Sequence, residues 1–305
     1  MSAWPATVDE ILRGDQIVGF AYVTPAKGVV LQPLTNMGDP AEPVSSSVAM
    51  FRKLQRVQQD PHVAVAYHTR KHGFSDRPEY VLVQGRGSLT PVADRDWVDR
   101  HRELWIRFAG PLPRNRLSEW ALREYHWRVG IQVEIERVVV WPDLACGGGP
   151  TVYGSPLPDE APAPQRPPAK GTGPRIRHAR AARRAEGLPH VLLGWVGADG
   201  FPVVAPVDVR GADDRGMLLR TPDGLVPGGG RRAGLLAHDF ARYAAGQDLS
   251  KHTGWLESTG DGAALYAPHT QSGYRMPSSK VVFRVSSAAV TKWRTRTARR
   301  AGFIP

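Results

Sequence analysis

The sequence predicts a mainly β protein, β-barrels with flanking helices (α+β), whose two domains arise by internal duplication. The chain has 305 residues, which exceeds the usual size of one domain. Strand-like runs occur in both halves, and residues 147–174 between them are rich in Pro, Gly and Ala, as linkers are. We therefore expect one domain at 1–146 and a diverged second domain at 175–305.

The first half contains five runs that alternate or are rich in β-branched residues, which indicates strands at 17–24, 28–37, 62–68, 79–89 and 131–141. Apolar residues at helical spacing predict two helices, one from Ser47 to Asp60 and one from Asp94 to Phe108. Ser47 is the expected N-cap of the first helix, and Asp60-Pro61 is its expected stop.

The second half repeats this pattern, with strands expected at 190–197, 201–209, 217–221, 254–258 and 281–285 and a helix at 231–244. Two short alignments favour a duplication. The first places Pro33 on Pro206, 173 positions apart, and the second places Arg52 on Arg231, 179 positions apart. Chance similarity between two β-rich domains is the alternative.

Composition limits the partners and the cellular compartment that we expect for this protein. The net charge of +11 favours an acidic partner such as a phosphate-bearing cofactor, although a basic surface that is merely solvated explains it too. The single cysteine, Cys146, cannot form an intramolecular disulfide, and no apolar run is long enough to span a membrane, so we expect a cytoplasmic protein. The histidines match no compact metal motif, and we predict no metal site. We interpret the basic stretches 175–184 and 291–300 as solvated helix faces, because they lack interleaved aromatic residues; nonspecific nucleic-acid binding is the minor alternative.

Residues 44–68 contain the clearest sign of a ligand site. Arg52 and Lys53 follow Ser45, Ser46 and Ser47 at the start of the first predicted helix, where cations are unfavourable unless an anion is also present. Hydroxyls and cations together suit a phosphate group. The alternative is that both basic residues are solvated, opposite the apolar stripe of the helix.

The run from Arg52-Lys53 through Val57 to Asp60-Pro61, followed by an alternating strand, resembles the pyridoxamine-5'-phosphate-oxidase-like, FMN-binding split-barrel superfamily. The resemblance implies two split barrels and a flavin phosphate held by Arg52 and Lys53. It also implies that Tyr80 lies near the flavin ring, where many members have Gln, and it adds Thr35 to the cofactor-binding candidates.

In that family two barrels pack together with the flavin between them, so a tandem chain implies an intramolecular pseudo-dimer. A homodimer of the whole chain is a further alternative. In the second half, Arg231 and Arg232 follow a run of glycines that could hold an anion, and Trp255 is a candidate ring contact. A flexible turn is the alternative for the glycines.

The resemblance implies a flavin-dependent oxidoreductase that uses FMN on a small-molecule substrate the sequence does not identify. A deazaflavin coenzyme is the nearest substitute. A noncatalytic flavin- or haem-binding protein is the alternative from another class, and an interaction module without a cofactor is a third. No catalytic residue is identified; His68 and His252 are considered for proton transfer, and a structural role is the preferred interpretation of both.

Overall fold

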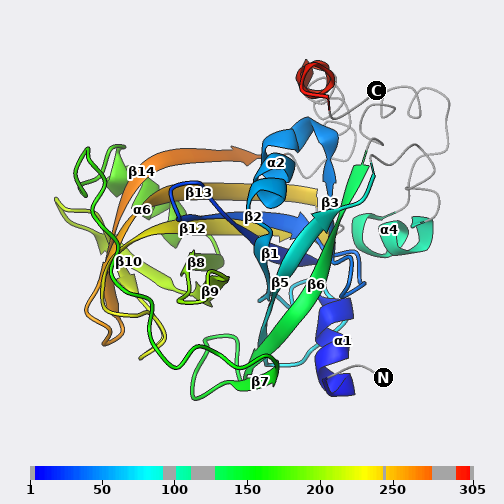
Figure 1. Cartoon of the computed structure of the whole chain (residues 1–305), viewed down its shortest axis with the longest axis horizontal. Helices are drawn as coiled ribbons and strands as arrows, with labels where there is room; N and C mark the ends of the chain where they lie inside the picture. Colours follow the sequence, from blue (N-terminus) through cyan, green and yellow to red (C-terminus); the bar gives the residue numbers. More distant parts are fainter. Residues whose placement is uncertain (1–3, 92–100, 111–127, 243–244, 277–292, 303–305) are drawn as a thin grey trace.

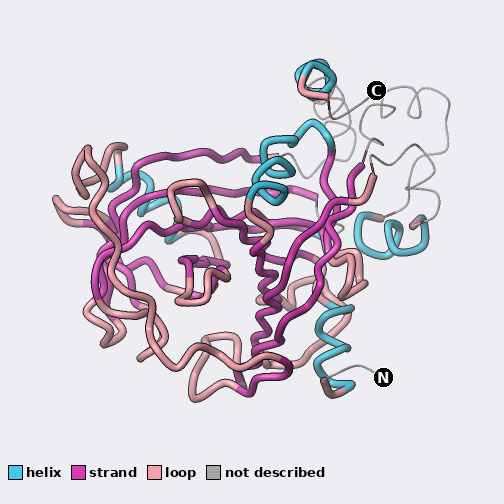
Figure 2. Tube along the Cα trace, viewed as in Figure 1, coloured by secondary structure: helices cyan, strands magenta, loops and turns pink. Residues whose placement is uncertain are grey.

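The computed structural model describes residues 4–91, 101–110, 128–242, 245–276 and 293–302, and it confirms a mainly β fold with two antiparallel sheets (Figures 1 and 2). The first sheet has the strand order β2-β1-β4-β5-β6-β3, with β7 paired to β6. Its strands are β1 (Ile17–Val23), β2 (Val29–Thr35), β3 (Val44–Ser47), β4 (His62–Tyr67), β5 (Tyr80–Leu89), β6 (Arg128–Trp141) and β7 (Thr151–Gly154).

The second sheet has the order β10-β11-β14-β13-β12-β8-β9. Its strands are β8 (His190–Val196), β9 (Pro202–Pro206), β10 (Asp208–Ala212), β11 (Met217–Arg220), β12 (Gly229–Ala241), β13 (Ala245–Ser258) and β14 (Ala263–Arg275). One helix precedes the first strand of each sheet: α1 (Ala6–Gly14) before β1, and α6 (His178–Glu186) before β8.

The two sheets repeat one topology. When the second is taken from its other end, β9, β8, β12, β13, β14 and β11 follow in the order of β2, β1, β4, β5, β6 and β3. The register agrees as well, because Pro33 pairs with Gly19 and Pro206 pairs with Leu192, and both pairs are 173 positions apart. The internal repeat is therefore present in the architecture, and the first of the two sequence alignments matches it.

The second alignment is wrong, because a helix is expected at 231–244 and residues 231–241 belong to strand β12; residues 243–244 lie outside the described residues. Alternate residues of β12 lie in two different cores: Leu235 packs in the core of the second half, and Leu236 packs against the first half. A strand buried on both faces is apolar throughout, so it loses the alternation that distinguishes a strand from a helix. No described helix of the second half corresponds to the one that carries Arg52.

The first predicted helix is present with a later start. Ser47 ends strand β3 and does not cap the helix; a short 3-10 turn (Val48–Met50) leads into α2 (Phe51–Gln59). The helix ends before Asp60-Pro61, as expected. Of the second predicted helix, the structure describes α4 (Arg102–Ala109), and residues 94–100 lie outside the described residues.

The faces of the two sheets meet in a shared core. Leu31 and Ala64 from the first half and Leu192 and Leu236 from the second are among its buried side chains. Backbones approach closely there, since a Cβ on Gly234 would lie 2.4 Å from the carbonyl oxygen of Val29. The two halves therefore pack as a pseudo-dimer within one chain.

The predicted domain limits stay predictions. Strand β7 lies inside the expected linker and pairs with β6. The expected strand at 281–285 lies outside the described residues. Among the described helices, none has the length and apolar character needed to cross a membrane.

Candidate anion-binding site

Lys53 is the most informative residue of the predicted phosphate site. It follows the exposed Arg52 on α2 and is only 3% exposed, beside the core residues Leu54 and Val57. Burial, and then the positive charges of Lys251 and Arg128, lower the pKa of Lys53 to about 7. No hydrogen bond or ion pair joins its ammonium group to another described residue, so the charge of this largely buried lysine has no counter-ion among them.

Arg128 begins strand β6 and stands directly opposite Ser47 on β3. The pair of Ser45 with Gly130 follows two residues along, so Ser45 and Ser47 share one face of the sheet with Arg128. Two hydroxyls and a guanidinium are thus placed on one surface beside α2. Ser46 pairs with the core residue Val129 on the opposite face, so it is separated from the other two serines.

The second half of the chain supplies Lys251. On β13 it is two residues from Leu249, whose side chain packs against the first half, and alternation places Lys251 on the same face. Burial, and then the charge of Arg294, lower the pKa of Lys251. Arg294 belongs to the helix at 293–300, which lies beside the 3-10 turn, since its Nη1 is 3.2 Å from the sulfur of Met50. Figure 1 shows this helix near α2.

One carboxylate borders this cluster. Glu42 lies over Gly130, where an added Cβ would be 2.1 Å from a carboxylate oxygen of Glu42. The cationic side chains nevertheless outnumber it, and Lys53 and Lys251 come from different halves of the molecule. Such an arrangement of lysines, arginines and hydroxyls suits a phosphate dianion held at the junction of the two halves.

Among the other predicted cofactor-binding residues, Thr35 lies in a position better suited to the junction of the two halves than that of Arg52. It shares the face of β2 with Val29 and Leu31, which pack against the second half. Arg52 is exposed to solvent. Of the predicted basic pair, therefore, Lys53 alone is buried.

Tyr80 lies elsewhere. It pairs with Trp141 at the far end of β6 from Arg128, in a strand of 14 residues, and its hydroxyl donates a 2.7 Å hydrogen bond to the carbonyl of Val204. Burial raises its pKa well above the usual value. The structure therefore places Tyr80 in the core between the halves and not beside Lys53.

Arg231, Arg232 and Trp255 form a separate group at one end of β12 and β13. The Arg231 guanidinium donates to the carbonyls of Pro162, Pro227 and Gly228, so it ties the predicted linker to the second sheet. Arg232 donates to the side chain of Gln165 and lies over the ring of Trp255. These two cations are engaged with the protein itself, which agrees with a structural role.

The histidines considered for proton transfer have structural environments. His68 and His238 meet across the two halves, with their Nε2 atoms 2.7 Å apart, so one neutral ring donates a hydrogen bond and the other accepts it. Burial lowers the pKa of His68 to about 3 and that of His252 to about 4. The Nε2 of His252 lies 3.0 Å from the Ser250 hydroxyl. The described residues contain no cluster suited to a metal ion.

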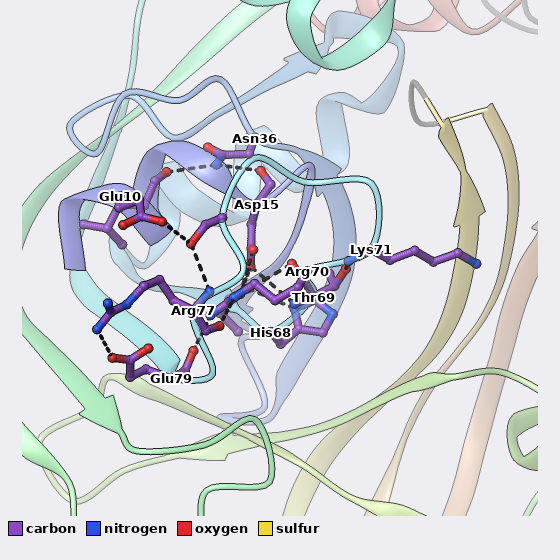
Figure 3. Close-up of polar contacts among 12 residues, drawn as sticks. Glu10, Asp15, Asn36, His68, Thr69, Arg70, Lys71, Arg77 and Glu79 are labelled. Carbon is purple, nitrogen blue, oxygen red and sulfur yellow. Dashed lines mark hydrogen bonds and ion pairs between the residues drawn. The ribbon is translucent and has the colours of Figure 1, made fainter. Parts of the chain in front are cut away.

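His68 also adjoins a polar network under α1 (Figure 3). At its centre, the Arg70 guanidinium lies 2.6 Å from the buried carboxylate of Asp15 and donates to the carbonyl of Arg77. Burial raises the pKa of Asp15 to about 7 against the opposing effect of Arg70. Arg70 thus joins Asp15 to the carbonyl of Arg77, and these contacts hold the loop between β4 and β5 in place.

Sequence reasoning did not identify Arg128, Lys251 or Arg294. Arg128 and Lys251 lie in strands, and only strand pairing and packing of the halves bring them to α2. One signal was present in the sequence: a lysine two residues from an inward-facing leucine on a strand indicates a buried charge.

No protein-family model matches the sequence, and no curated protein matches it. Solved structures do match. A conserved hypothetical protein from Mycobacterium tuberculosis is 18% identical, with 48% of this chain and 87% of that chain covered and a TM-score of 0.35. The general stress protein 26 of Bacillus anthracis is 16% identical, over 44% of this chain and 90% of that chain, with a TM-score of 0.29.

A pyridoxamine 5'-phosphate oxidase-related, FMN-binding protein from Nostoc punctiforme is 10% identical, over 68% of this chain and 98% of that chain, with a TM-score of 0.33. By its name, the Nostoc protein is related to the pyridoxamine-5'-phosphate-oxidase-like superfamily.

Proposed function

We propose that this protein binds FMN through its phosphate, at the junction of its two halves, and uses it as a flavin-dependent oxidoreductase. The observation that carries the proposal is the buried Lys53, which has no partner among the described residues and lies near Arg128 and, from the other half, Lys251. A phosphate would supply the missing counter-charge and acceptor oxygens.

The described residues fit the phosphate end of the cofactor. Ser45, Ser47 and Arg128 on one sheet surface would hold its oxygens beside Lys53, and Lys251 would close the site from the second half. FMN, once bound, supplies hydride or electron transfer, whereas the protein supplies orientation and charge. A deazaflavin coenzyme presents a phosphate too, and it is the alternative ligand for the same residues.

The first experiment compares FMN with riboflavin, which has the same ring and no phosphate. Each is titrated into the protein and its fluorescence followed, for the native chain, Lys53→Met and Arg52→Ala. We expect FMN to bind at least tenfold more tightly than riboflavin, and Lys53→Met to remove this preference while Arg52→Ala keeps it. Equal affinity for the two flavins in the native chain would contradict the phosphate site.

A noncatalytic flavin-binding protein is the second candidate, because the cations and serine hydroxyls identified in the site would all contact the phosphate, and none of them is assigned to the flavin ring. Stopped-flow reduction of the FMN complex by a nicotinamide donor distinguishes the two. Reduction faster than that of free FMN supports the oxidoreductase, and a rate no greater than that of free FMN supports the binding protein. Repeating the titration with a deazaflavin coenzyme tests the alternative cofactor.

A further inference from the structure

The repeat gives the anion site a counterpart in the other half of the molecule. Both β5 and β13 carry a bulge, which falls before Gly85 in one and before Gly254 in the other. A Cβ on Gly85 would lie 2.2 Å from the carbonyl oxygen of Glu134, and one on Gly254 would lie 2.3 Å from that of Ala267. The two glycines therefore occupy equivalent positions, each against the next strand.

This equivalence shows how the counterpart site differs. Three residues before each glycine, Lys251 of β13 corresponds to Leu82 of β5. Glu134 and Ala267 are 133 positions apart, and the same offset relates Arg128 to Asp261. The segment 221–228, which connects β11 to β12, contains no helix and thus no equivalent of Lys53. The counterpart site therefore has none of the three cations.

A pocket of about 270 Å³ lies at the counterpart position, because Leu82 and Leu225 of the segment 221–228 are among the residues that line it. It is formed by both halves and by the predicted linker, and its walls are mostly apolar: Leu82, Val139, Trp141, Trp195, Val203 and Leu225. At about 30 Å³ per water molecule, this volume corresponds to roughly nine waters, or roughly ten non-hydrogen atoms of a ligand.

Arg137, the one cation among the described residues that line the pocket, is already paired. The Arg137 guanidinium donates to the Gln84 side chain at 2.6 Å and to the Pro156 carbonyl at 2.8 Å, and it forms an ion pair with Asp199. The Gln84 amide donates in turn to the Pro202 carbonyl. An anion entering this pocket would meet no uncommitted cation among the described residues, so the pocket disfavours phosphate.

We propose that this pocket is a second binding site, which takes an uncharged aromatic molecule of about two fused rings. The indoles of Trp141 and Trp195 and the aliphatic walls suit a flat apolar ring. The proposal does not depend on flavin binding, because it rests on different residues.

The test uses 2-naphthol, which is uncharged at neutral pH and has eleven non-hydrogen atoms, titrated by calorimetry. Ala198 is an exposed residue that lines the pocket, so Ala198→Trp fills its mouth without entering the core. Ala26→Trp, in the exposed turn between β1 and β2, is the matched control. We expect saturable binding by the native chain and by Ala26→Trp, and at least tenfold weaker binding by Ala198→Trp.

Two further arms separate this site from the anion site. Binding of 2-naphthol should persist in Lys53→Met and in the presence of excess FMN. Competition by FMN, equal binding by a folded Ala198→Trp variant, or no binding by the native chain would each overturn the proposal.

Discussion

The site around Lys53 and the pocket around Arg137 occupy equivalent places in a repeated architecture, yet their charges are handled in opposite ways. Lys53 is buried among other cations, with no partner among the described residues, whereas Arg137 is buried with every donor group engaged. Duplicated backbones therefore do not imply duplicated sites. Ligand chemistry depends on a few side chains, such as Lys251 and its equivalent Leu82.

The largest expected effect is the loss of FMN affinity when Lys53 and Lys251 are both replaced. The pocket has no equivalent of either lysine. A hydrogen bond to a charged group contributes about 1.5–3 kcal/mol, so Lys53→Ala combined with Lys251→Ala should weaken FMN binding by about 100-fold or more. Leu82→Ala, at the position equivalent to Lys251, should leave the affinity unchanged. Fluorescence titration measures both, and equal losses in the two variants would contradict the assignment.

At the pocket, the largest expected effect of a substitution is a loss of protein stability. Asp199→Ala removes the partner of the buried Arg137, and we expect the free energy of unfolding to fall by about 1–2 kcal/mol. The value is below that for a fully buried pair because the Asp199 side chain is 26% exposed. Denaturant unfolding measures this loss. Lys53→Met, which removes an uncompensated buried charge, should not destabilise the protein, and a clear loss of stability there would contradict the contrast.

The contact between the two halves through His68 and His238 should be sensitive to acid. His68 and His238 are neutral and buried, and burial lowers the pKa of the adjacent His190 as well. Arg70 and Lys71 add positive charge nearby, opposed by Asp239. A folded-state pKa near 3 for His68, below the usual 6.5, means that the unfolded chain binds more protons between these values. His68 alone should therefore contribute a fall of about 1.4 kcal/mol per pH unit in the free energy of unfolding below pH 6.5, and His238 should add to it.

Unfolding experiments across this pH range measure the slope, and His68→Gln should reduce it. Because Asp15 has a pKa raised to about 7, its protonation opposes the trend, and Asp15→Asn serves to separate the two contributions. An unchanged slope in His68→Gln would exclude the histidine pair as the source.

The last comparison concerns the pH dependence of FMN affinity. The pKa of Lys53 in the free protein is about 7, so above this pH the protein must take up a proton to present a cation to the phosphate. Affinity should fall by up to about tenfold per pH unit between 7.5 and 9. Lys53→Met should abolish this dependence, and a flat profile in the native chain would show that Lys53 does not contact the phosphate.

The sequence was informative where side-chain pattern and local geometry coincide. The alternating run at 62–68 and the Asp60-Pro61 stop correspond to β4 and to the end of α2. It failed at 231–244, because both faces of β12 are buried and the alternation disappears. For the candidate site, the sequence identified Ser45, Ser47 and Lys53 as neighbours along the chain. It could not indicate that Arg231 and Arg232 donate to backbone carbonyls, because those partners are brought near by the fold.

By itself, the sequence predicted a mainly β protein with an internal repeat. It also placed hydroxyls and a basic pair in residues 45–53, because strand alternation and these side chains are properties of residues close together in the chain. The tertiary structure decided which basic residues gather around Lys53. Arg128 and Lys251 are 75 and 198 positions from Lys53 along the chain, and only strand pairing and the packing of the two sheets bring them together. It also decided that the equivalent place became an apolar pocket, because that outcome depends on which strands face each other across the two halves.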